Sequence, residues 1–201
     1  MNKFKLPNLV TYIGAASSVT AMILAFNQKI NIAMICLIIS GISDLFDGKF
    51  ARGFKRTDTE KLVGIELDSL SDVTNFLICP VVICLGMGFH GCISYIVFVL
   101  YVLAGITRLA VFNVGAAENN VDTPVTRYNG LPVTYAAVLF PFFWLFSRVL
   151  DDSAFQILYT IVMLIIAYLF VSNIKIPKPK GIALPIFSVA AIIMTVVLII
   201  L

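Results

Sequence analysis

Four aspartates on either side of a short polar segment have the spacing of a metal centre. Asp44 and Asp47 are three residues apart near the end of one apolar run, and Asp68 and Asp72 are four apart near the start of the next. On a helix, each pair should project from a single face. Carboxylates at membrane depth cost about 2.5 to 3.5 kcal/mol each and repel one another, so a cation must offset them. The pattern predicts an oxygen-rich site for Mg²⁺ or Mn²⁺, with two ions bound and positions left open for a phosphate.

Helix capping is a simpler role for an aspartate near a helix end, but it does not suit this set. Asp44 and Asp47 lie at the C-terminal end of their apolar run, where the helix dipole disfavours anions. Gly48 follows Asp47 and would let a ligand approach the backbone closely, and Gly64 lies one turn before Asp68 on the same face. Arg52 adds a planar guanidinium suited to a phosphate.

These residues form an ordered pattern. The run Asp44-x-x-Asp47-Gly48-x-x-Ala51-Arg52, followed by Gly64-x-x-x-Asp68-x-x-x-Asp72, resembles the signature of the CDP-alcohol phosphotransferases, integral membrane enzymes of phospholipid synthesis. Eleven residues separate Arg52 from Gly64, where eight is the commonest spacing in that family. We expect the three extra residues to lengthen a surface loop over residues 53–63 without moving the aspartates.

The resemblance implies a role for each signature position. The metal ligands would be Asp44, Asp47, Asp68 and Asp72, and the cytidine nucleotide and its phosphates would be bound by Asp44, Asp47, Gly48, Ala51, Arg52, Gly64 and Asp68. Asp72 would contact the second metal and act as the general base, and CMP would leave. This chemistry suits the residue types, because a hydroxyl must lose its proton as it attacks phosphorus. A homodimer is also implied by the family.

Segments outside the signature look like the phosphatidylserine synthase branch of the family. They are GIELDSLSDV at 64–73, RLAVFN at 108–113, NGLPVT at 129–134 and VSNIKIP at 171–177. The implied reaction transfers the phosphatidyl group of CDP-diacylglycerol to the hydroxyl of L-serine. Arg108, Asn113 and Arg127 are the candidate serine-binding residues. Two positions depart from the branch: Val111 stands where a basic residue is frequent, and Thr134 where a second proline is common.

Several alternatives remain at this level. The acceptor could be glycerol 3-phosphate, inositol phosphate or choline, and the donor could carry an archaeal-type ether lipid. Arg108 could be a positive anchor that extends to the membrane surface. A rival from another class is an ion-coupled transporter, which would place charges near the midplane of broken helices, often with internal repeats. Here the aspartates cluster at one interface, and the sequence shows no repeat.

Composition and apolar runs predict the fold class. The 201 residues are 60% hydrophobic and 12% charged, with a mean hydropathy of +1.01, which excludes an ordinary soluble domain. We expect an all-α integral membrane protein and one domain over residues 1–201, with a six-helix core of the family and a seventh helix at about 182–201. The expected spans are 7–26, 30–50, 64–87, 93–114, 131–146, 155–171 and 182–201, with Asp68 and Asp72 in the first turns of the third.

Charge placement predicts how the chain lies in the membrane. Twelve of the fourteen Lys and Arg residues fall on the side of the aspartates, and only Lys29 and Arg148 fall on the other. By the positive-inside rule the site should face the cytoplasm. The net charge of +3 is small and scattered, which excludes nucleic acid as a partner.

Overall fold

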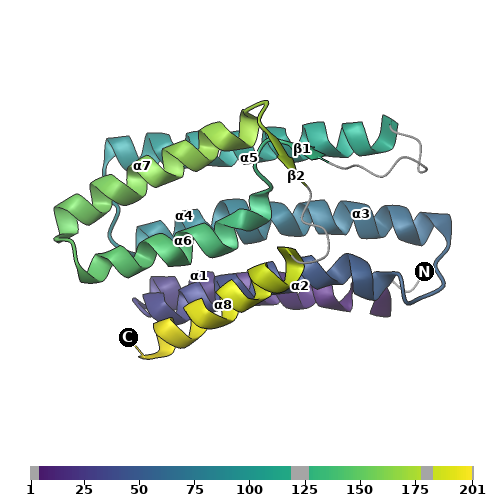
Figure 1. Cartoon of the computed structure of the whole chain (residues 1–201), viewed down its shortest axis with the longest axis horizontal. Helices are drawn as coiled ribbons and strands as arrows, with labels where there is room; N and C mark the ends of the chain where they lie inside the picture. The colour runs from purple at the N-terminus through teal and green to yellow at the C-terminus, as the bar shows by residue number, and fades with distance from the viewer. Residues whose placement is uncertain (1–4, 119–126, 178–182, 201) are drawn as a thin grey trace.

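The structure is a computed structural model that describes residues 5–118, 127–177 and 183–200. Its helices lie side by side in a bundle (Figure 1). The helices are α1 (Leu9–Phe26), α2 (Ile30–Ala51), α3 (Asp58–Asp72), α4 (Cys79–Gly86), α5 (Cys92–Glu118), α6 (Ala136–Trp144), α7 (Asp152–Val171) and α8 (Ala183–Ile200). Short 3₁₀ turns at Leu6–Asn8, Val133–Tyr135 and Leu145–Arg148 extend α1 and both ends of α6.

Most of these helices belong to apolar stretches of membrane-crossing length. Five helical stretches are long and apolar enough to span a bilayer, and two shorter apolar ones accompany them, at Val133–Arg148 and Ser188–Ile200. The chain is therefore an all-α, multi-pass integral membrane protein, as composition predicted. The spans lie close to the predicted ranges except at the start of the third.

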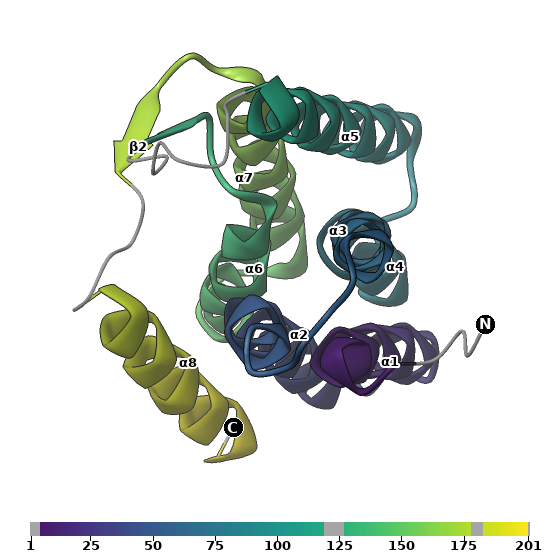
Figure 2. The same ribbon diagram turned by 90° about the vertical axis from the view of Figure 1, so that its right-hand side faces the viewer.

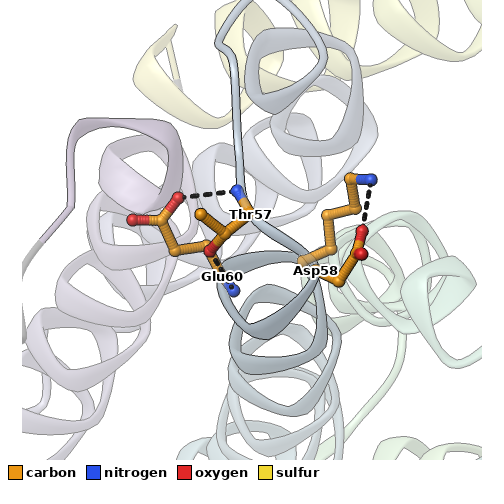
Figure 3. A network of polar contacts seen from close by, with 4 residues as sticks. Thr57, Asp58 and Glu60 are labelled. Carbon is orange, nitrogen blue, oxygen red and sulfur yellow. Dashed lines mark hydrogen bonds and ion pairs between the residues drawn. The ribbon is translucent and has the colours of Figure 1, made fainter.

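The third span begins earlier than predicted. Thr57 and Glu60 form a capping box, in which Glu60 N–H donates to Thr57 Oγ1 (3.3 Å) and Thr57 N–H donates to Glu60 Oε2 (3.0 Å), as Figure 3 shows. These bonds satisfy N–H groups that a helix start leaves open, so α3 begins at Asp58. The expected loop over 53–63 is wrong in its second half, and Asp68 and Asp72 lie in the later turns of α3 rather than its first.

A proline shapes the middle of the same span. Pro80 has no N–H to donate to the carbonyl of Phe76 four residues earlier, and the chain there is π-helical over Val73–Ile78. The buried hydroxyl of Tyr101 on α5 donates to that carbonyl instead (2.6 Å). The chain from Asp58 to Gly86 thereby remains one continuous span, and Asp72 is the last α-helical residue before the π segment.

The view along the bundle shows how the helices are arranged around one another (Figure 2). Helix α2 packs on α1 and α6, α1 also packs on α4, α5 packs on α7, and α8 lies against α2 on the outside. Gly41 of α2 lies so close to Ala137 of α6 that a side chain at 41 would collide with it. This close approach brings the start of α6 against the face of α2 that carries Asp44.

A short antiparallel ribbon joins two of the connections. Strand β1 (Arg127–Asn129) pairs with β2 (Lys175–Pro177), with Tyr128 opposite Ile176. Just after β1, Gly130 N–H donates to the Ile174 carbonyl and Leu131 N–H to the Leu169 carbonyl, each at 2.9 Å. The ribbon was not predicted, and it holds the segment before α6 against the end of α7.

Candidate active site

Carboxylates from α2 and α3 meet between the two helices. Asp44, Asp68 and Asp72 each offer an oxygen, and these oxygens all lie within 4.8 Å of one another. The carboxylates of Asp44 and Asp72 are within hydrogen-bonding range of each other, and so are those of Asp47 and Asp68. The structure thus brings all four predicted aspartates into two facing pairs, as the three- and four-residue spacings required.

Two threonines orient the aspartates of α2. Thr134, from the turn before α6, donates from Oγ1 to Asp44 Oδ2 (2.8 Å). Thr11, from α1, donates from Oγ1 to Asp47 Oδ2 (3.1 Å), and both of these residues are buried. Sequence reasoning missed both contacts. Thr11 carried one usable signal, since it is a polar residue in the first turn of a span that begins on the aspartate side.

The aspartates of α3 each have an oxygen without a hydrogen-bond donor among the described residues, which favours metal binding. Asp68 Oδ1 and Asp72 Oδ1 are buried and accept no hydrogen bond from any residue in the described part of the chain. Ionised carboxylates have no proton to donate to one another, so the facing pairs repel unless a cation lies between them. Hard divalent ions prefer such oxygen ligands, so the residues present fit Mg²⁺ or Mn²⁺.

A cavity of about 360 Å³ opens beside the aspartates, at the end of the bundle where α1 begins and α2 ends. Six of the predicted nucleotide residues line it, and Asp44 is the one that does not. The lining residues are Pro7, Asn8, Thr11, Asp47, Gly48, Ala51, Arg52, Arg56, Lys61, Gly64, Ile65 and Asp68. A side-chain carbon at Gly48 would meet no atom within 4 Å, so the backbone there is open to a ligand.

The three serine-binding candidates have different positions. Arg108 on α5 is only 8% exposed, with its guanidinium 5.0 Å from the Phe112 ring centre. Its charge acts on Asp44 and Asp72, so it lies at the site and is not an anchor that extends to the surface. Asn113 donates to Ser69 Oγ of α3 (2.8 Å), one residue along from Asp68. Arg127 begins β1, and its side chain lies outside the described part of the structure.

Comparison with known proteins identifies the same family as the signature residues. The profile of the family described as CDP-alcohol phosphatidyltransferase matches residues 4–172. The archaetidylserine synthase of Methanothermobacter thermautotrophicus is 31% identical over 88% of this chain and 71% of its own length. The CDP-diacylglycerol–serine O-phosphatidyltransferase of Helicobacter pylori is 32% identical over 87% of this chain and 72% of its own. The enzyme of the same name from Methanocaldococcus jannaschii is 33% identical over 77% of this chain and 68% of its own length. The chain therefore belongs to the CDP-alcohol phosphatidyltransferase family.

Proposed function

We propose that the chain transfers a phosphatidyl group from a CDP-linked lipid to L-serine. The observation that carries the proposal is the pair of buried oxygens on Asp68 and Asp72 that lack a donor among the described residues, next to a cationic cavity lined by the family signature. The serine hydroxyl attacks the phosphorus attached to the lipid alcohol. The bond from that phosphorus to the bridging oxygen of CMP breaks, giving phosphatidylserine and CMP.

The aspartate cluster would hold two divalent ions through Asp44, Asp47, Asp68 and Asp72. When bound, the ions supply electrostatic stabilisation of the attacking and leaving oxygens. The protein's part is to present the carboxylates in one geometry. Thr134 and Thr11 each donate to one oxygen of an α2 aspartate, which fixes the orientation of the carboxylate and leaves its other oxygen for an ion.

Asp72 is the proposed general base. It lies beside Asp44, has a buried oxygen with no donor from the described residues, and feels the charge of Arg108. A base must reach the proton that it removes, and we place the serine hydroxyl beside this oxygen, next to the ions that the aspartates would hold. The serine proton passes to that oxygen as the new bond to phosphorus forms.

Serine is the acceptor that the surroundings favour. A serine carboxylate needs one cationic partner, and Arg108 is a buried guanidinium whose charge acts on Asp44 and Asp72 and which does not line the nucleotide cavity. A phosphorylated acceptor would need several cations there. The relatives' names agree on serine and differ in the lipid, because one names archaetidylserine and the others name CDP-diacylglycerol.

The membrane setting completes the proposal. With most Lys and Arg residues on the aspartate side, the site would face the cytoplasm, where nucleotide-activated precursors are found. The family resemblance also leads us to propose a homodimer and a single domain over the whole chain, in which α8 is added to a six-helix core.

The direct test is CMP release by the purified protein in detergent. CDP-diacylglycerol and an ether-linked CDP-lipid would each be supplied with Mg²⁺ or Mn²⁺. The acceptors compared would be L-serine, glycerol 3-phosphate, inositol, inositol phosphate and choline, with EDTA as the metal-free control. We expect metal-dependent release with serine alone. Release with another acceptor would overturn the serine assignment, and a folded protein that binds neither CMP nor CDP would favour the ion-coupled transporter.

A further inference from the structure

The segment between Arg52 and Gly64 contributes cations to the nucleotide cavity. Sequence spacing suggested that its extra residues would form a surface loop. Instead Arg56, in the short connection before α3, and Lys61, in the first turns of α3, both line the cavity. Neither residue belongs to the family signature that the sequence carries.

Arg56 lies directly over the signature glycine. Its Nη1 is 3.4 Å from the point that a Gly64 side-chain carbon would occupy, and Asn8 Oδ1 is 3.5 Å from the same point. Gly64 and Asp68 are four residues apart on one face of α3, which separates them by about 6 Å along the helix axis. A phosphate bound near Asp68 through a metal would therefore lie within reach of the Arg56 guanidinium.

The acidic residues nearest in sequence are already engaged. Glu60 pairs with Lys5 (2.9 Å) and accepts from the Thr57 N–H. Asp58 pairs with Lys61 (2.8 Å), a contact drawn in Figure 3. Arg56 itself is partly buried and forms no hydrogen bond or ion pair within the described ranges 5–118, 127–177 and 183–200. A guanidinium partly removed from water, with its neighbouring acids engaged, is suited to an anionic ligand.

We propose that Arg56 is a second phosphate-binding arginine of the donor site, acting beside Arg52 on the diphosphate of the CDP-lipid. This inference rests on the proposed function. The cavity lining combines the carboxylates of Asp47 and Asp68 with the guanidinium groups of Arg52 and Arg56, so a diphosphate bound there can meet the metal ligands and the arginines together. Lys61 contributes less, because Asp58 already offsets its charge.

The test separates phosphate binding from general damage to the site. The variants are Arg56→Gln and Arg56→Lys, and Lys55→Gln is the matched control because Lys55 is an exposed neighbour outside the cavity lining. The inhibition constants of CDP and of cytidine would be measured against turnover, with calorimetric CDP binding for any variant too slow to assay.

For Arg56→Gln we expect the inhibition constant of CDP to rise about ten- to a hundredfold while the inhibition constant of cytidine stays unchanged. The inhibition constant of CDP for Arg56→Lys should lie between those of the wild type and Arg56→Gln, because an ammonium lacks the planar fork of a guanidinium. Lys55→Gln should match the wild type. The inference is overturned if Arg56→Gln binds CDP as the wild type does, or if the CDP and cytidine constants rise together. A different result would show that the proposed function is wrong: the wild-type protein itself would then neither release CMP nor bind CDP.

Discussion

The hydroxyl of Thr134 donates a 2.8 Å hydrogen bond to Oδ2 of Asp44, joining two residues that are ninety positions apart in the chain. Thr134 stands in the turn that precedes α6, and the Leu131 N–H just before that turn donates to the Leu169 carbonyl of α7. The orientation of a proposed metal ligand on α2 therefore depends on the connection between α5 and α6, which also carries the serine-branch motif NGLPVT.

Replacing Thr134 by Val should weaken metal binding with little effect on folding, because valine keeps the shape and loses the hydroxyl. Groups that orient metal ligands typically contribute about ten- to a hundredfold in affinity. Mn²⁺ binding followed by electron paramagnetic resonance, with no substrate present, measures this directly, and Thr134→Ser should restore most of the affinity.

Thr107→Val is the matched control for that change. The Thr107 hydroxyl is exposed and donates within its own helix to the Leu103 carbonyl (2.8 Å). Equal Mn²⁺ affinity in Thr134→Val and Thr107→Val would show that the bond to Asp44 has no role in holding the ion.

Replacing Asp72 by Asn should abolish turnover and retain nucleotide binding better than Asp44→Asn or Asp47→Asn does. An amide cannot take the serine proton, and loss of a general base typically costs about 10²- to 10⁴-fold in rate. CMP release and calorimetric CDP binding, measured on the same three preparations, give the comparison. Near-normal turnover in Asp72→Asn would remove Asp72 from the role of base.

Replacing Arg108 by Gln should raise the KM for serine about tenfold or more, since a charge-assisted contact to the serine carboxylate would be lost. The KM for the CDP-lipid should change far less, because Arg108 does not line the nucleotide cavity. Steady-state kinetics with each substrate varied in turn separates the two. An increase in the KM for the CDP-lipid alone would instead assign Arg108 to the donor-binding site.

Replacing Tyr101 by Phe should destabilise the protein by about 1 to 3 kcal/mol, because the buried Phe76 carbonyl would lose the hydroxyl donor that stands in for the missing N–H of Pro80. In a Pro80→Ala background the cost should be smaller, since residue 80 then has an N–H for that carbonyl. Thermal unfolding in detergent measures both, with Tyr168→Phe as the control because Tyr168 is 68% exposed. An equal loss of stability on Tyr101→Phe in the wild-type and Pro80→Ala proteins would contradict this account of the π segment.

The spans and the aspartate pairs were predictable because both depend on local information. Apolar runs of membrane length and helical spacing are readable without knowing the packing. The start of α3 was also encoded locally: Thr57 and Glu60 have the spacing of a capping box, but the charged residues around them suggested a loop. Local helix-start chemistry outweighs a polar composition here.

Contacts between distant segments could not be predicted in the same way. Thr134 reaches Asp44 only because Gly41 lets α6 approach α2 closely, which is a property of packing. The three-residue strands β1 and β2 are too short to show a periodic pattern, and they pair across the whole of α6 and α7. Arg56 could be read only as one charge among several until the start of α3 was placed.

The chain begins and ends its helical path at opposite ends of the bundle. Pro7 and Asn8, at the entry to α1, line the nucleotide cavity, while α8 runs away from that end toward the C-terminus (Figure 1). Five helical stretches within the described residues are long enough to cross a bilayer, and two shorter apolar ones accompany them. If all seven cross, a reporter fused after α8 should label the side of the membrane opposite to the nucleotide cavity, whereas an affinity tag fused ahead of Pro7 should lie beside that cavity and compete with the CDP-lipid for space.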